Sequence, residues 1–136
     1  MSHYKPIEQS FKVAYEYKLH FTENIFSLHN PLFKDIIKGY NNKGDVKVLF
    51  VIDSGVLACH PNLKADITSY CTQNSSAIHL TEQLVIAGGE QCKNDYHNVE
   101  RILNAVNDNR ICRHSFVVAI GGGAIIDMVG YAAAIA

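Results

Sequence analysis

The amino-acid sequence predicts an α/β fold with a mainly parallel sheet flanked by helices. Two apolar runs, Val46 to Ile52 and Phe116 to Ile120, have the length of strands but lack the alternation of a half-exposed strand, which is typical of parallel strands covered on both faces. Each run ends in a turn and is followed by a segment with helical spacing, so strands and helices alternate. With 136 residues and 48% hydrophobic content, the chain is large enough for one domain with a buried core.

The N-terminal part contributes one more expected strand and a short helix. From Phe11 to Phe21 the odd positions are Phe, Val, Tyr, Tyr, Leu and Phe, whereas the even positions are mostly polar. This period of two predicts a half-buried strand. Apolar residues at helical spacing then predict a helix from Pro31 to Lys38 that ends at Gly39.

The rest of the chain continues the alternation. A helix is expected from Val56 to about Cys71, broken or started at Pro61. A short strand is expected from Gln83 to Ala87 and a long amphipathic helix from Asn94 to Asp108. A last helix should follow the strand that ends at Ile120.

The C-terminal segment from Ile125 to Ala136 is apolar almost all round, with Asp127 as its one charged residue. Such a helix has to be buried on more than one side. We therefore expect that residues 1–136 are one domain of a longer protein from which a further layer is missing. An uncovered apolar helix of this kind also predicts self-association, most simply as a homodimer.

The composition excludes several classes of partner. A net charge of −1, from 12 basic and 13 acidic residues spread along the chain, leaves no block for nucleic acid or an anionic membrane. No apolar run approaches the roughly 20 residues of a membrane span, and no secretory signal opens the chain, so a cytoplasmic protein is expected. The four cysteines form no CxxC pair, so we expect reduced thiols and no metal site.

The first candidate site is the Gly121-Gly122-Gly123 run between a strand and a helix. A helix N-terminus offers unpaired N–H groups, and glycines let a pyrophosphate approach them closely. The alternative is a tight turn that needs glycine only for its backbone angles. The run does not match the GxGxxG pattern of ordinary dinucleotide-binding domains.

The second candidate is Asp53, directly after the first buried strand, because ligand contacts in such sheets lie at the carboxyl ends of strands. A carboxylate there would accept both ribose hydroxyls and repel a 2′-phosphate, which favours NAD over NADP. The alternative is a cap or turn that Asp53 makes with Ser54-Gly55.

The third candidate is Gly88-Gly89-Glu90-Gln91-Cys92-Lys93, another glycine turn after a strand. Glu90 would accept a hydrogen bond from a nicotinamide or ribose group, and Lys93 would meet an anion. The alternative is a surface ion pair at the start of a helix.

The three motifs in this order resemble those of the dehydroquinate synthase superfamily, in which a strand-terminal Asp, a GGExxK turn and a GGGxxxD turn follow one another. The likeness covers most of Val46 to Ala136 and implies the Rossmann-like N-terminal domain of that fold. It implies Asp53 at the adenosine ribose and Glu90 and Lys93 near the nicotinamide, with Gly89 in the same turn. It further implies Gly121, Gly122 and Gly123 at the pyrophosphate and Asp127 beside the cofactor.

The resemblance implies a phosphate-eliminating cyclase that acts on a phosphorylated sugar. In that family NAD takes up a hydride and returns it, so that an adjacent C–H is acidified and phosphate leaves before the ring closes. A divalent metal, zinc or cobalt, and most substrate contacts belong to a helical domain beyond these residues. No catalytic or metal-ligating residue is therefore assigned here, and residues 1–136 alone are expected to be inactive.

Two departures leave alternatives open. Ile126 replaces the glycine of the GGGxxGD motif of dehydroquinate synthases proper, and the GGGAxxDxxGYAAA pattern looks more like the divergent cyclase-like proteins of ebo gene clusters. Metal-dependent alcohol and polyol dehydrogenases share the fold and GGGxxxD, but their motif continues to a lysine where Gly130 stands. A degenerate cyclase that binds a nucleotide without catalysis is the third alternative.

Overall fold

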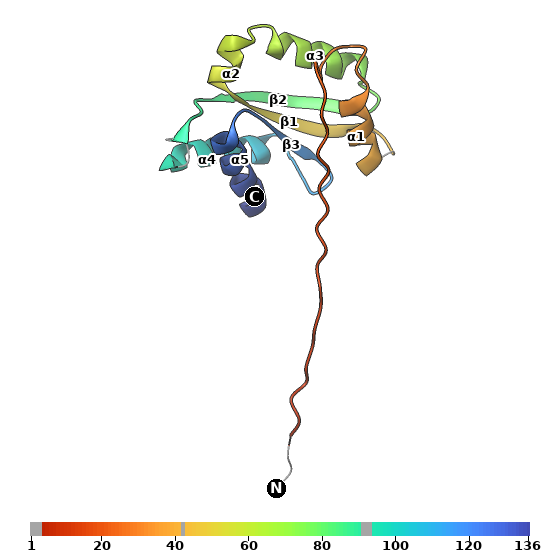
Figure 1. The fold of residues 1–136 in the computed structure, drawn as a ribbon, viewed down its shortest axis with the longest axis vertical. Coiled ribbons are helices and arrows are strands. Elements are labelled where there is room, and N and C mark those ends of the chain that lie inside the picture. Colours follow the sequence, from red (N-terminus) through yellow and green to blue (C-terminus); the bar gives the residue numbers. More distant parts are fainter. Residues whose placement is uncertain (1–3, 42, 91–93) are drawn as a thin grey trace.

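The computed structural model describes residues 4–41, 43–90 and 94–136, and in them three parallel strands form one sheet in the order β2-β1-β3 (Figure 1). The strands are β1 (Val46–Asp53), β2 (Ile78–Ile86) and β3 (Phe116–Ile120). The helices are α1 (Leu32–Tyr40), α2 (Ser54–Cys59), α3 (Leu63–Gln73), α4 (Tyr96–Asp108) and α5 (Gly123–Ile135). The predicted α/β class with a parallel sheet flanked by helices is confirmed.

Strand β1 is the centre of the sheet. Its residues from Val48 to Ile52 are fully buried, as the unbroken apolar run predicts for a parallel strand covered on both faces. It pairs along its whole length with β2, with a register shift between Val48 and Leu49, and from Val48 to Ile52 with β3. The strand ends at Asp53, so that residue stands at the carboxyl edge of the sheet.

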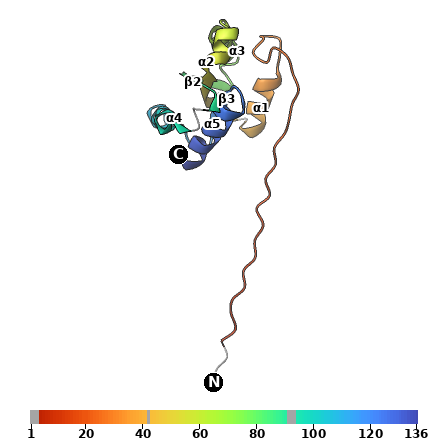
Figure 2. The same ribbon diagram turned by 60° about the vertical axis from the view of Figure 1, so that its left-hand side comes forward.

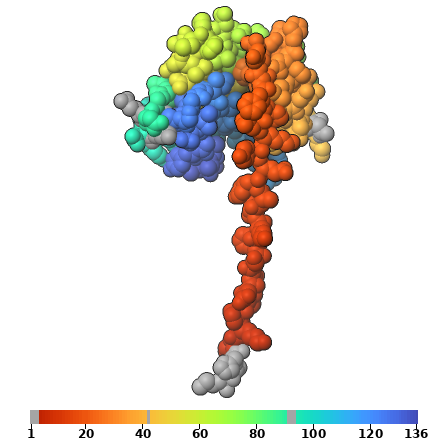
Figure 3. Space-filling view, in the orientation of Figure 1, coloured from red at the N-terminus to blue at the C-terminus, as the bar shows by residue number. Residues whose placement is uncertain are grey.

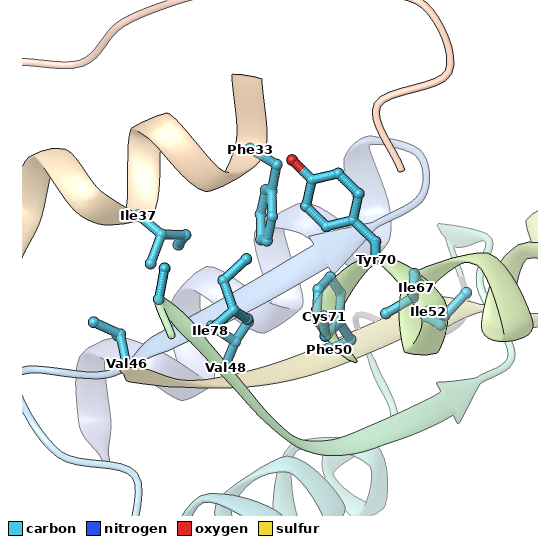
Figure 4. Packing of buried hydrophobic residues seen from close by; sticks show 11 residues of the cluster. Phe33, Ile37, Val46, Val48, Phe50, Ile52, Ile67, Tyr70, Cys71 and Ile78 are labelled. Atoms are coloured by element: carbon cyan, nitrogen blue, oxygen red, sulfur yellow. The ribbon is translucent and has the colours of Figure 1, made fainter. Parts of the chain in front are cut away.

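Helices cover both faces of the sheet and divide the core into two clusters. On one face, α1 and α3 pack against alternate residues of β1 around Phe50, as Figure 4 shows. On the other face, α4 and α5 bury Val51 under Ile102 and Ile125. Figure 2, turned from the first view, separates α4 and α5 from α1 and α3. Each helix presents one apolar face to the sheet, which is the arrangement that buries both elements.

Tyr70 fastens the segment before α1 to this core. Its ring is fully buried beside Phe26 and Phe33, its hydroxyl donates to the Asn30 carbonyl at 2.7 Å, and it accepts from the Lys34 amide at 3.2 Å. Burial raises the pKa of the Tyr70 hydroxyl, so the neutral form that makes both bonds is favoured.

Tyr70→Phe is expected to lower the free energy of unfolding by about 1–3 kcal/mol, because the Asn30 carbonyl and the Lys34 amide would lose their partner. Chemical denaturation of the two proteins measures the difference. Thr72→Val is a suitable control, since its hydroxyl bonds only to a carbonyl of its own helix at the surface. A Tyr70→Phe protein as stable as the parent would show that water replaces the lost bonds.

The strand predicted from Phe11 to Phe21 is wrong. The segment is extended but pairs with no strand, and Figure 1 shows it running away from the folded body. Phe11 is 86% exposed and Tyr17 is 92% exposed. The alternating pattern describes a strand with one covered face, but a strand also needs a neighbouring strand and a cover, and nothing within the described residues supplies either.

Other boundaries differ by smaller amounts. The predicted break at Pro61 is confirmed, since α2 and α3 are separate helices on either side of it. Strand β2 begins five residues earlier than expected, because the polar residues at its start hide a segment that pairs fully with β1. Arg101 of α4 is half-buried and donates to the Val85 carbonyl of β2 at 3.0 Å.

Helix α5 is covered on one side, while Ile126, Tyr131 and Ile135 remain about half exposed. This agrees with the expectation that an all-round apolar helix has more apolar surface than one sheet can cover. Within the described ranges, no helix has the length and apolar character required to cross a membrane.

Candidate nucleotide site

At the carboxyl ends of β1 and β3, a place called the crevice below, the chain leaves the two strands toward opposite faces of the sheet. After β1 it enters α2 and α3, which contribute to the first core cluster, and after β3 it enters α5 in the second. Strand β1 is central, so this is the point where the strand order reverses. In open parallel sheets, ligands bind outside the strand ends at such a point.

Asp53 lies in this crevice and is surrounded by glycines from all three strand ends. A Cβ atom on Gly88 would overlap the Asp53 carboxylate, and one on Gly121 would come within 2.9 Å of the Asp53 Cβ. A Cβ on Gly55 would stand 3.2 Å from Oδ1. Gly88 and Gly121 therefore leave the room that the Asp53 side chain occupies, and a side chain at position 55 would require a shift of a few tenths of an ångström.

The capping alternative for Asp53 is also confirmed. Its Oδ1 accepts from the Gly55 amide at 2.8 Å and so caps α2. That bond fixes the direction of the half-buried carboxylate at the crevice. Capping and ligand contact are compatible, because a carboxylate has about four acceptor positions.

The three glycines after β3 differ in whether neighbouring atoms leave room for a side chain. None of the three has a positive φ, so a left-handed backbone is not the reason for glycine at these positions. Gly121 is required by its neighbours, because a Cβ there would also overlap the Ile125 side chain. Around Gly122 and Gly123 a Cβ would meet nothing within 4 Å among the residues that the structure describes, so no contact in that part of the chain demands glycine at either position.

Gly122 and Gly123 stand at the start of α5. Gly122 is the residue before the first helical turn, and no side chain caps the helix. The amides of this turn are the donors that an α-helix leaves without partners in its own backbone. Open space in front of them, bordered by glycine, is where an anionic group can approach a helix N-terminus.

The turn after β2 is only partly described. Gly89 has φ of +96°, which favours glycine over any residue with a Cβ. Glu90 is exposed next to it. Lys93, the other predicted contact of this motif, lies outside the described residues, so neither its cofactor role nor the alternative ion pair with Glu90 is tested.

Asp127 lies one turn into α5 and lines a hollow of about 450 Å³ between this helix and the start of α4. The remaining lining residues are Asn94, Tyr96, Val99, Met128 and Tyr131. The structure thus brings Asp127 next to the chain that follows the Gly88-Gly89-Glu90 turn. Its place beside a cofactor stays a prediction.

A larger hollow of about 910 Å³ lies beside β3 on the side of α2 and α3. One end reaches Val56 and Ile120 at the crevice, and Cys59 and His60 also line it. Over the ranges the structure covers, no three His, Cys, Asp or Glu side chains are grouped so that they could hold a metal ion.

The sequence motifs missed Gly88 as a site residue. The family resemblance places Gly89 in the cofactor-binding turn and gives Gly88 no role, whereas in the structure Gly88 makes room for the Asp53 carboxylate. Only the strand order, which places the end of β2 beside the end of β1, reveals this contact.

Comparison with known proteins supports the predicted family. Residues 83–136 match the family model described as 3-dehydroquinate synthase N-terminal. The 3-dehydroquinate synthase of Helicobacter pylori strain G27 is 39% identical over 89 residues, which are 65% of this chain and 23% of the relative. That of Sulfurimonas denitrificans is 37% identical over 91 residues, 67% of this chain and 24% of the relative.

A second activity appears among the relatives. The 2-epi-5-epi-valiolone synthase of Streptomyces glaucescens is 28% identical over 118 residues, which are 87% of this chain and 28% of the relative. The chain thus spans about a quarter of the length of the curated relatives it matches.

Proposed function

Because these matches identify the chain as the N-terminal domain of a dehydroquinate-synthase-like sugar phosphate cyclase, we propose that it forms the NAD-binding half of such an enzyme. The whole enzyme would cyclise a phosphorylated sugar with loss of phosphate. We place it in the cytoplasm as a homodimer, and we keep the proposal that it belongs with the divergent ebo-type cyclase-like proteins.

One observation carries the proposal. Gly122 and Gly123 are glycines that neither a positive φ nor any contact within 4 Å in the described part of the chain requires, and they open the first turn of α5 to solvent. At the cap position of Gly122 glycine is preferred over alanine, whereas inside a helix, where Gly123 begins the first turn, glycine costs up to about 0.5–1 kcal/mol relative to alanine. A pyrophosphate lying against these amides supplies a reason for both residues.

The other predicted site residues have side chains that suit the remaining parts of a dinucleotide. Asp53, held by the Gly55 amide at the reversal of strand order, would accept the hydroxyls of the adenosine ribose. Glu90 and Lys93 would meet the nicotinamide side and Asp127 would stand beside the cofactor. When bound, NAD would take up a hydride and return it, which makes a C–H beside the temporary ketone acidic enough for phosphate to leave.

The role of Asp53 predicts that NAD binds at least about tenfold more tightly than NADP, since a 2′-phosphate would face a carboxylate. Calorimetric titration of each nucleotide into the protein measures both affinities. Asp53→Asn should narrow the difference, because it removes the negative charge and keeps an oxygen that can cap α2. Equal affinity, or tighter binding of NADP, would rule out this role of Asp53.

The dehydrogenase alternative makes a different prediction for the whole enzyme. A cyclase releases inorganic phosphate from a phosphosugar without accumulating NADH, whereas a polyol dehydrogenase accumulates NADH and releases no phosphate. Phosphate detection and absorbance at the NADH band, recorded together, separate the two. Residues 1–136 alone should give neither signal.

A further inference from the structure

One cationic side chain joins helix α4 to strand β2 close to the candidate nucleotide site. The Arg101 guanidinium is half-buried, and one of its terminal nitrogens donates to the Val85 carbonyl at 3.0 Å. A hydrogen bond from an ionised donor is stronger than one between neutral groups. This bond therefore fixes the backbone of β2 at Val85 relative to α4.

Val85 lies at the carboxyl end of β2, beside the crevice. It is paired with Ile52 of β1, and the next residue of β2 is paired with Asp53. The turn Gly88-Gly89-Glu90 begins three positions after Val85. A movement of β2 at Val85 would therefore be passed directly to this turn.

Arg101 itself stands on a firmly packed helix. Its neighbour Ile102 is fully buried in the second core cluster, to which Val99 of the same helix also belongs. Asp95 caps the start of α4 by accepting from the His97 amide at 3.0 Å. Figure 3 shows α4, in teal, lying directly against α5, in blue. The donor is thus held by the core, and the end of β2 is the part that it positions.

A second contact joins α4 to β2 farther from the crevice. The Asn109 side chain, at the C-terminal end of α4, donates to Glu82 Oε2 at 2.7 Å and to a carbonyl of its own helix at 2.8 Å. Glu82 lies in the middle of β2, and about 20 Å of extended chain separates it from Gly88. Both contacts tie the same helix to the same strand, but that of Arg101 is the one beside the crevice.

We propose that Arg101 is a positioning residue for the nicotinamide end of the bound dinucleotide. The inference rests on the proposed function, in which Glu90 meets that end and Asp53 meets the adenosine ribose. Arg101 acts through β2 and does not itself touch the nucleotide. Asp53 has its own support, because the Gly55 amide donates to it at 2.8 Å. Loss of the Arg101 bond should therefore disturb the contacts of the turn after β2 and spare those of Asp53.

Two nucleotides test this role, because ADP-ribose contains every part of NAD except the nicotinamide. Calorimetric titration of the whole enzyme with each nucleotide measures both affinities. Arg101→Met keeps a long unbranched side chain but has no donor. It should weaken NAD binding at least about fivefold, since the loss of a charged hydrogen bond reaches the ligand only in part, and should change ADP-ribose binding by less than about twofold.

Asn109→Ala is the matched control, because it breaks the other contact between α4 and β2. It should lower the free energy of unfolding, as Arg101→Met does, but leave the ratio of the two affinities unchanged. Arg101→Lys keeps a charged donor and should retain most of the NAD affinity. Any loss in this variant should again fall on NAD alone, so it carries the test if Arg101→Met does not fold.

Amide hydrogen exchange without nucleotide gives an independent measure. Residues 87–90 should exchange faster in Arg101→Met than in the parent enzyme, and at the parent rate in Asn109→Ala. An Arg101→Met enzyme that loses both affinities by the same factor, or neither, overturns the proposal, because Arg101 would then serve only the stability of the sheet. A parent enzyme that binds NAD and ADP-ribose equally well also overturns it. A parent enzyme that binds neither nucleotide contradicts the proposed function itself, and this inference falls with it.

Discussion

Gly122→Val is expected to weaken NAD binding by at least about 100-fold while the domain keeps its fold. The backbone of Gly122 has φ of −81° and ψ of −178°, which valine adopts freely, and a Cβ there meets no atom of the described ranges within 4 Å. The two added methyl groups would instead fill the space in which a pyrophosphate must approach the first turn of α5. A 100-fold loss corresponds to about 2.7 kcal/mol of binding free energy.

Calorimetry gives the affinity, and circular dichroism with thermal unfolding gives the fold and the stability. Gly39→Val is the matched control, because Gly39 is also surrounded by open space but lies in the last turn of α1, away from the carboxyl ends of the strands. Unchanged affinity in a folded Gly122→Val protein would show that the glycine run is only a link between β3 and α5.

The central part of the fold follows from local sequence. The run Val46 to Ile52 has no polar face, so it can only be a strand covered on both sides, and the structure buries it between two layers of helices. Helix α4 follows from its apolar spacing in the same way, and Asp95 caps it by accepting from the His97 amide. These elements can be predicted from local sequence because each packs against its neighbours along one continuous apolar face.

The segment from Phe11 to Phe21 shows where a local sequence pattern no longer predicts the structure. Its period of two is the strongest strand pattern in the chain, yet residues 11–21 pair with no strand. Alternation indicates which side chains should be buried, but it does not indicate which strand provides the neighbouring backbone. The start of β2 is the opposite case, since the polar residues His79, Thr81 and Glu82 conceal a segment that pairs with β1, with one register shift between Val48 and Leu49.

The candidate site could likewise be predicted only in part from the sequence. Asp53 and the Gly121-Gly122-Gly123 run could be assigned from their position after buried strands, because the carboxyl ends of parallel strands meet at one edge. The reason for each glycine could not be assigned. Gly89 serves its backbone angle and Gly121 makes room for side chains, whereas Gly122 and Gly123 have neither a positive φ nor a neighbour among the described residues that a Cβ would meet. That distinction depends on which strand ends lie together, which a motif does not record.

Gly121→Ala is expected to lower the free energy of unfolding by about 1–3 kcal/mol, the usual cost of forcing an extra group into a filled space. The new methyl group would overlap the side chain of Ile125, which is 1% exposed and packed in the second core cluster, and would press on the Cβ of Asp53. Ile125 is branched at Cβ and has few alternative rotamers, so β3 and α5 have to separate instead.

Gly130→Ala, inside α5, is the control. It adds the same methyl group where nothing lies within 4 Å, and it should raise stability by about 0.5–1 kcal/mol because alanine favours a helix interior. Urea denaturation of the three proteins gives the two differences with opposite signs. If Gly121→Ala were as stable as the parent, the close approach of β3, Asp53 and α5 would be relaxed in solution, and the fixed position of the Asp53 carboxylate in the crevice would have to be abandoned with it.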